Sequence, residues 1–139
     1  MSFSLPYKWI TAEELAALIK SKSDDEMKRY AVVDVRDSDF AGGNIIRAIN
    51  SPSETFYDSA GSLVKQLEDV PQVIFHCALS QQRGPKAARA SIYAETRREI
   101  LPSAPDQEIL VLRDGFTGFQ QKYRDDPELV EKFNKFFHD

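Results

Sequence analysis

Three short runs rich in apolar and β-branched residues constrain the fold of this chain more than any other feature. They cover Tyr30–Val35, Val73–Phe75 and Ile109–Leu112. Strands that are apolar along most of their length, rather than at alternate positions, are typical of sheets covered on both faces. The segments between the runs are long enough for helices. The pattern therefore predicts an α/β fold, with a central, mostly parallel sheet and helices on both faces.

Helix signals precede and follow the first of these runs. Thr11 and Glu14 have the spacing of a capping box, which predicts a helix that begins at Thr11. Residues 53–69 are also expected to be helical, with an interruption at Gly61. The apolar stripe of the first helix is expected to be Leu15, Leu18 and Ile19.

Further elements are expected around the other two runs. A short strand is predicted around residues 45–49, and Gly84-Pro85 is expected to open a long helix, since proline is favoured in a first helical turn. Residues 116–139 are expected to form two amphipathic helices separated by Asp126-Pro127.

Length and composition indicate a single domain over residues 1–139, with 42% hydrophobic and 29% charged residues. A net charge of −4 argues against nucleic-acid and polybasic membrane partners, which need a cationic surface. The apolar runs are too short to span a bilayer. The first residues lack the basic and hydrophobic regions of a secretory signal, so we expect a protein that is not secreted.

Cys77 is the only cysteine of the chain and excludes an internal disulfide. This usage fits a reducing compartment, and we expect the cytoplasm, the nucleus or both. Because His76 and His138 are the only histidines, a zinc site rich in cysteine and histidine cannot be assembled, and no metal is expected. The lone thiol is therefore either an inert core residue or a nucleophile.

The position of Cys77 favours the nucleophile. It follows the second apolar run, and in parallel sheets ligands bind beyond the carboxyl ends of the strands. A loop that enters a helix can turn its N–H groups toward an anion, and Arg83 can bind two oxygens of a tetrahedral dianion. We expect Cys77 and Arg83 to be catalytic, with a phosphate-binding loop of Ala78, Leu79, Ser80, Gln81, Gln82 and Arg83.

The same loop predicts the chemistry. An anion-binding field stabilises a thiolate, so the pKa of Cys77 should lie well below its free value of about 8.5. The thiolate would attack the phosphorus of a monoester, and water would hydrolyse the resulting thiophosphate. We expect His76 to support this site rather than to react. The opposing interpretation is a structural thiol at a strand end, which the strand–loop–helix context and Arg83 argue against.

His76-Cys77, five residues and then Arg83 resemble the signature of the cell-division-cycle dual-specificity phosphatases, whose catalytic domain has the rhodanese fold. Asp34-Val35-Arg36 resembles the first conserved region of rhodanese domains, and residues 112–119 resemble the loop that closes them. The resemblance covers nearly the whole chain. It extends to the small stand-alone members of fungi and plants, which include the fungal itsy-bitsy phosphatase and arsenate reductases. It implies a rhodanese-like fold and a protein phosphatase activity of the tyrosine or dual-specificity type.

The chain departs from these families at several positions. Asn44 and Arg47 replace the usual rhodanese histidine and glycine and are expected to alter only a turn. The large phosphatases have glutamates within the loop, one of them a proposed general acid, where this chain has Ala78 and Gln82. A phenolate leaves without an acid more readily than an alkoxide. The sequence selects no acid among three aspartates of neighbouring loops, Asp37, Asp39 and Asp114.

Four functions are compatible with the same loop. A phosphatase would act on a phosphorylated protein or a small aryl phosphate without a cofactor. An arsenate reductase would bind arsenate, which matches phosphate in shape and charge, and would need an external thiol such as glutathione or glutaredoxin. A thiosulfate sulfurtransferase is less favoured, because that class has a loop one residue shorter. A non-catalytic phosphate-binding module would leave the nucleophile unused.

Overall fold

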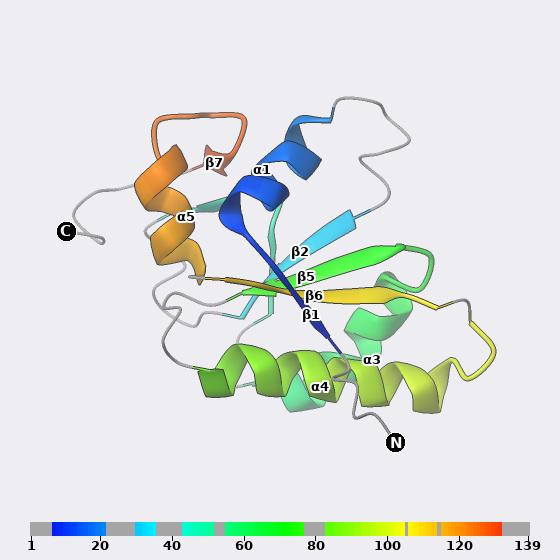
Figure 1. Cartoon of the computed structure of the whole chain (residues 1–139). Helices are drawn as coiled ribbons and strands as arrows, with labels where there is room; N and C mark the ends of the chain where they lie inside the picture. The colour runs from blue at the N-terminus through cyan, green and yellow to red at the C-terminus, as the bar shows by residue number, and fades with distance from the viewer. Residues whose placement is uncertain are drawn as a thin grey trace, which may run out of the picture.

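A computed structural model describes residues 7–21, 30–35, 43–51, 55–76, 83–104, 106–113 and 115–131, with the backbone alone for Tyr57 and residues 83–89. Five parallel strands form the central sheet in the order β1-β6-β5-β2-β4 (Figure 1). The predicted parallel sheet is therefore confirmed. The strands are β1 Lys8–Ile10, β2 Tyr30–Asp34, β4 Ile49–Asn50, β5 Gln72–His76 and β6 Glu108–Leu112.

Helices cover both faces of this sheet, as the apolar runs predicted. Helices α1 and α5 lie on one face, and α3 and α4 lie on the other (Figure 1). Among the described helices, none combines the length and the apolar character needed to cross a membrane. The helices are α1 Ala12–Lys20, α3 Phe56–Gln66, α4 Arg83–Ile100 and α5 Gly115–Tyr123.

A second, two-stranded sheet corrects the expectation for the C-terminal region. Strand β7, Val130–Glu131, pairs antiparallel with β3, Asn44–Ile45. The first predicted helix of that region is α5, but residues 130–131 are a strand where the second helix was expected. The rest of that predicted helix, residues 132–139, lies outside the described residues. Leu129 and Val130 are buried, so tertiary packing outweighs the helical pattern here.

Two further differences concern short strands. The edge strand β1 was not predicted, because three residues with only Ile10 buried are too few to show a period. The strand predicted around residues 45–49 is split into β3 and β4. Arg47 lies between them with a φ of 59°, which turns the chain out of an extended conformation.

Helix α3 continues through Gly61, where an interruption was expected. A Cβ atom at this position would lie 3.3 Å from Cδ1 of Ile100, at the end of α4. The glycine therefore allows close packing of α3 against α4 rather than a break in the helix.

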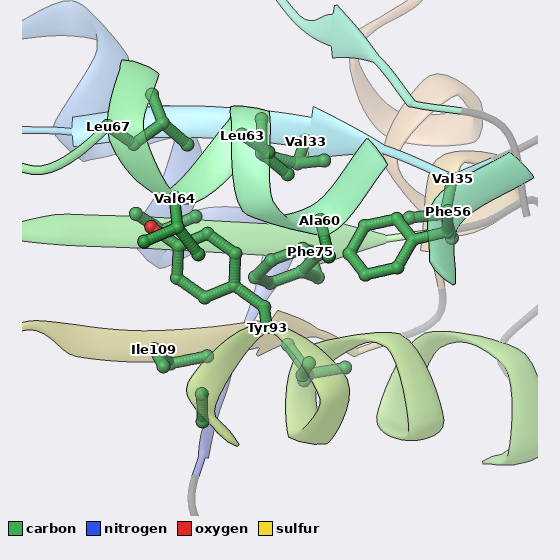
Figure 2. Packing of buried hydrophobic residues seen from close by; sticks show 14 residues of the cluster. Val33, Val35, Phe56, Ala60, Leu63, Val64, Leu67, Phe75, Tyr93 and Ile109 are labelled. Carbon is green, nitrogen blue, oxygen red and sulfur yellow. The ribbon is translucent and has the colours of Figure 1, made fainter. Parts of the chain in front are cut away.

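Aromatic residues anchor the carboxyl-terminal part of β5 on the α3/α4 face. The ring of Phe75 packs edge-on against Phe56 of α3 and Tyr93 of α4, with centroid separations of 6.0 and 5.2 Å. Figure 2 shows Phe75 between these two rings, below the first turns of α3. All three side chains are fully buried. This packing fixes the strand one residue before His76.

Candidate active site

The carboxyl ends of β2, β5 and β6 lie side by side and define the candidate site. In the sheet register, His76 of β5 is opposite Asp34 of β2, and Phe75 is opposite Val111 of β6. The chain continues from β5 directly into Cys77. This edge of a parallel sheet is where ligands bind in α/β folds, in agreement with the region predicted from the sequence.

The predicted site residues are described only in part. Cys77 and the loop residues Ala78, Leu79, Ser80, Gln81 and Gln82 lie outside the described residues, as do Asp37, Asp39 and Asp114. Arg83 is the first residue of α4, and its side chain is not described. The catalytic roles of Cys77 and Arg83 and the lowered pKa of Cys77 therefore stay predictions.

Helix α4 supplies an electrostatic feature of the site. It begins at Arg83, runs for 18 residues and has no acidic residue in its first turn. The aligned peptide dipoles give such a helix a partial positive charge at its N-terminus, which favours a bound anion. Residues 77–82 join the end of β5 to this helix end, so an anion near the loop would meet a favourable field.

His76 is fully buried at the end of β5. Its carbonyl oxygen accepts a hydrogen bond of 2.9 Å from the backbone N–H of Val35. Its ring atom Nε2 lies 3.6 Å from Oδ2 of Asp34, which is also fully buried. On the α5 side, the ring of Phe116 stacks on the imidazole with a centroid separation of 6.4 Å and an interplanar angle of 29°.

Sequence reasoning did not assign a role to Asp34 or Phe116. A usable signal existed for Asp34, which is the one charged residue within the apolar run Tyr30–Val35. A charged group is rarely fully buried unless it has a partner. The contact of Phe116 with His76 could not be predicted in this way, because an apolar residue in the first turn of a helix is typical of any core position.

Asn44 and Arg47, the two departures from the rhodanese pattern, also have structural roles. Asn44 donates hydrogen bonds of 2.8 Å from Nδ2 to the carboxylate of Glu131 and to the carbonyl of Ile45. It therefore ties β3 to β7, which is more than the altered turn that was expected. Arg47 does lie in a turn, and its guanidinium is 3.5 Å from the hydroxyl of Tyr30.

Comparison with known proteins decides the family. The rhodanese-like domain family matches residues 11–122. The chain belongs to the rhodanese-like family. The sequence resemblance and the rhodanese-like fold are thus confirmed.

Individual relatives of this rhodanese-like protein include phosphatases. The dual specificity phosphatase ibp1 of Schizosaccharomyces pombe is 30% identical over 113 residues, which cover 73% of this chain and 82% of the relative. The structure of Saccharomyces cerevisiae Ygr203w, a homolog of single-domain rhodanese and the Cdc25 phosphatase catalytic domain, superimposes with a TM-score of 0.73 at 27% identity. That match covers 96% of this chain and 93% of Ygr203w.

A reductase of the same fold is also similar. The As-Sb reductase from Leishmania major gives a TM-score of 0.67 at 30% sequence identity. The match covers 89% of this chain and 84% of the reductase. Relatives of this rhodanese-like protein therefore include both enzyme classes that the loop signature suggested.

Proposed function

We propose that the protein is a cysteine-dependent phosphatase of the tyrosine or dual-specificity type. One observation carries the proposal: β5 ends at His76 and α4 begins at Arg83. The five residues that separate Cys77 from Arg83 thus belong to the connection between a central strand and a helix N-terminus. That connection is the strand–loop–helix context in which backbone N–H groups bind phosphate. Similarity to the phosphatase ibp1 supports the same activity.

The proposed reaction has two steps at Cys77. The thiolate attacks the phosphorus of a phosphate monoester, an S–P bond forms, and the bond to the leaving oxygen breaks. Water then attacks the phosphorus, the S–P bond breaks, and inorganic phosphate and the thiolate are released. Arg83 and the loop N–H groups stabilise the negative charge on the transferred oxygens in both steps. The thiolate performs the covalent chemistry without a metal or an organic cofactor.

Substrate preference follows from the leaving group. Residues 78–82 include no aspartate or glutamate, so the loop has no carboxyl group to protonate a departing alkoxide. General acid catalysis is worth about 10²–10⁴-fold, and a phenolate depends on it least. We propose that phosphotyrosine or another aryl phosphate is hydrolysed faster than a phosphoserine-type ester. The partner is then a phosphorylated protein or a small aryl phosphate in the cytoplasm or nucleus.

Hydrolysis of p-nitrophenyl phosphate tests the proposal. We expect vanadate-sensitive turnover in the wild type, none in Cys77→Ser, and a kcat/KM reduced by about 10²-fold in Arg83→Lys, because an ammonium group cannot bind two oxygens in a planar fork. Arg98→Lys is the matched control, since Arg98 is exposed near the opposite end of α4. Undiminished turnover in Cys77→Ser would refute the proposal.

Arsenate reduction is a second candidate, which the similarity to the As-Sb reductase favours. Cys77 would displace a hydroxyl group of arsenate and form a thiol–arsenic(V) adduct. Reduction to arsenite then requires two electrons, which two thiols supply when they are oxidised to a disulfide. Cys77 is the chain's only thiol, so at least one must come from glutathione or a glutaredoxin.

Both activities can be compared on one preparation. Loss of arsenate in the presence of glutathione and glutaredoxin is measured beside hydrolysis of p-nitrophenyl phosphate. A phosphatase shows the larger kcat/KM for the aryl phosphate and little thiol-dependent consumption of arsenate. The reverse ratio would assign the protein to the reductases.

A further inference from the structure

An exposed arginine lies over an exposed tryptophan near the candidate site. The Cζ atom of Arg113 is 5.6 Å from the ring centroid of Trp9, within the range of a cation–π contact. Trp9 belongs to the edge strand β1 and is 39% exposed, and Tyr7 packs edge-on against its indole at 5.9 Å. A cation–π contact uses none of the guanidinium N–H donors, so these stay available to an acceptor.

The strand register places Arg113 at the level of the candidate site. Val111 of β6 pairs with Phe75 of β5. Arg113 follows Val111 by two residues, so it lies one residue past the level at which β5 ends. Its backbone N–H donates a hydrogen bond of 2.8 Å to the carbonyl of Ile10 in β1. The amino end of α4 lies at the same end of the sheet (Figure 1). A cation is therefore held one strand away from the proposed loop.

The surroundings of Arg113 favour an acidic partner. Within the described part of the chain, no carboxylate forms an ion pair with its guanidinium. The side chain is exposed, so a partner from solution can reach it. The whole chain has a net charge of −4, so binding of an acidic partner depends on a local cation rather than on the overall field. A guanidinium binds a carboxylate through two parallel hydrogen bonds.

We propose that Arg113, held in place by Trp9, binds a carboxylate of the substrate close in sequence to its phosphotyrosine. This inference rests on the proposed phosphatase function and adds a substrate class, acidic phosphotyrosine peptides. Neighbouring strands are about 5 Å apart, and an extended peptide advances about 3.3 Å per residue. The acidic residue should therefore lie within about three residues of the phosphotyrosine. Arg113 touches the substrate, whereas Trp9 is a positioning residue that acts through Arg113.

Matched pairs of phosphotyrosine peptides measure this preference. One peptide of each pair has glutamate at a single flanking position, and the other has glutamine there. For the best position, we expect the wild type to show a kcat/KM about fivefold higher for the glutamate peptide. The difference should lie mainly in KM, because the ion pair adds to binding rather than to the chemical step. Equal kcat/KM values at every position would overturn the proposal.

Two arginine variants locate the preference. We expect Arg113→Gln to reduce the ratio of the two kcat/KM values to about one, because glutamine has no charge to pair with the carboxylate. The matched control is Arg98→Gln, which removes the same charge at an exposed position near the other end of α4 and should keep the fivefold ratio. A ratio between two peptides is unaffected by a general change in activity. An unchanged ratio in Arg113→Gln, or an equal loss in the control, would refute the role of Arg113.

Variants of Trp9 test its positioning role. Trp9→Leu keeps an apolar side chain but removes the ring, so we expect the preference for glutamate to fall to about twofold. Trp9→Phe keeps a smaller ring and should regain part of the preference. A fivefold preference that persists in Trp9→Leu would show that Arg113 does not need the indole and would contradict this role.

Fluorescence provides a readout that does not depend on turnover. Trp9 is the only tryptophan of the chain, so its emission reports on a ligand bound at Arg113. The peptides contain no tryptophan and are titrated into Cys77→Ser, which cannot form the covalent intermediate. We expect the Kd of the glutamate peptide to be about fivefold lower than that of its glutamine partner. Equal Kd values would overturn the proposal.

The combined results separate this inference from the proposed function. The expected difference in Kd, in a protein whose wild type hydrolyses neither peptide, would refute the phosphatase function and leave the acidic-peptide site intact. Hydrolysis of both peptides with equal kcat/KM would refute the site and leave the phosphatase function intact. A concentration-dependent dimer that Trp9→Leu abolishes would assign this surface to a second copy of the chain, which would also overturn the inference.

Discussion

Arg47 has a strained backbone conformation at a position outside the candidate site. Its φ of 59° lies in the left-handed region. A side chain in that region costs about 1–2 kcal/mol, and glycine costs least. The Arg47 guanidinium lies 3.5 Å from the hydroxyl of Tyr30, and the side chain is exposed. A glycine at this position, as the rhodanese resemblance implies, would adopt the same φ without that cost.

Glycine at position 47 should give a more stable protein than alanine at the same position. We expect Arg47→Gly to have a free energy of unfolding about 1 kcal/mol larger than that of Arg47→Ala, because both lack the long side chain and only glycine relieves the strained φ. Urea unfolding of the two variants and the wild type measures this difference. Equal stability of the glycine and alanine variants would show that the backbone at this position is not strained.

At the same scale, the candidate site was only partly predictable. The end of the strand that leads into Cys77 could be predicted, because the apolar run marks a buried strand, and β5 ends at His76. The part played by Asp34 could not be predicted in the same way. Its approach to His76 depends on the parallel register of β2 against β5, and Phe116 reaches the same ring from helix α5, far along the chain.

At the scale of elements, the capping box of α1 is a local feature that can be recognised from the sequence alone. The N–H of Glu14 donates to Oγ1 of Thr11 at 3.1 Å, and the N–H of Thr11 donates to the carboxylate of Glu14 at 3.0 Å. Each bond involves residues three positions apart, so no tertiary information is needed to predict it.

Removal of this cap should destabilise the fold. We expect Thr11→Ala to lower the free energy of unfolding by about 1 kcal/mol, because a helix N–H group loses its partner. Thr96→Ala is the matched control within α4, where the Thr96 hydroxyl only donates back to the carbonyl of Ile92. That change should be neutral or slightly stabilising, since alanine favours a helix interior. Equal losses in the two variants, measured by urea unfolding, would contradict the capping role.

Tyr93, in the middle of α4, gives the fold a dependence on alkaline pH. Burial raises the pKa of Tyr93 above its usual value of 10.0, while the nearby charge of Arg97 acts in the opposite direction. The unfolded chain therefore loses this proton at a lower pH than the folded protein does. The stability linked to Tyr93 is complete below about pH 10 and is lost as the pH rises through the raised folded value.

A pH series of unfolding experiments tests this linkage. Between about pH 9 and pH 11, the free energy of unfolding should fall more steeply in the wild type than in Tyr93→Phe, which has no phenolic proton to lose. The pH dependence itself is the readout, so a constant difference in stability between the two proteins does not affect the test. Identical slopes would contradict a raised pKa for Tyr93.

Elements with strong local patterns could be predicted from the sequence, and elements that depend on a tertiary partner could not. Strands β2, β5 and β6 and helix α4 were predictable because buried parallel strands and a Gly-Pro helix start leave strong local patterns. Strand β1 has three residues and β7 has two, and each forms because a partner strand is already in place. The continuous helix through Gly61 likewise depends on the approach of Ile100 from α4.

For the whole molecule, strand order determines where chemistry can occur. Strand β5 occupies the centre of the sheet, between β2 and β6, and its carboxyl end is bordered by the ends of both neighbours (Figure 1). Aromatic packing holds β5 from the α3/α4 side, and Phe116 covers its last residue from the α5 side. The fold thus holds the end of β5, the strand that leads into Cys77, from both faces of the sheet.

The proposed mechanism requires that Cys77 forms a covalent bond to phosphorus during turnover. Rapid acid quenching of the wild type with p-nitrophenyl phosphate, followed by mass spectrometry of the digested protein, measures this directly. We predict one phosphoryl group on the peptide that contains Cys77, at a level that rises within the first turnover and decays as substrate is consumed. Turnover of the substrate with no phosphorylated Cys77 peptide, or with the phosphoryl group on another residue, would rule out this mechanism.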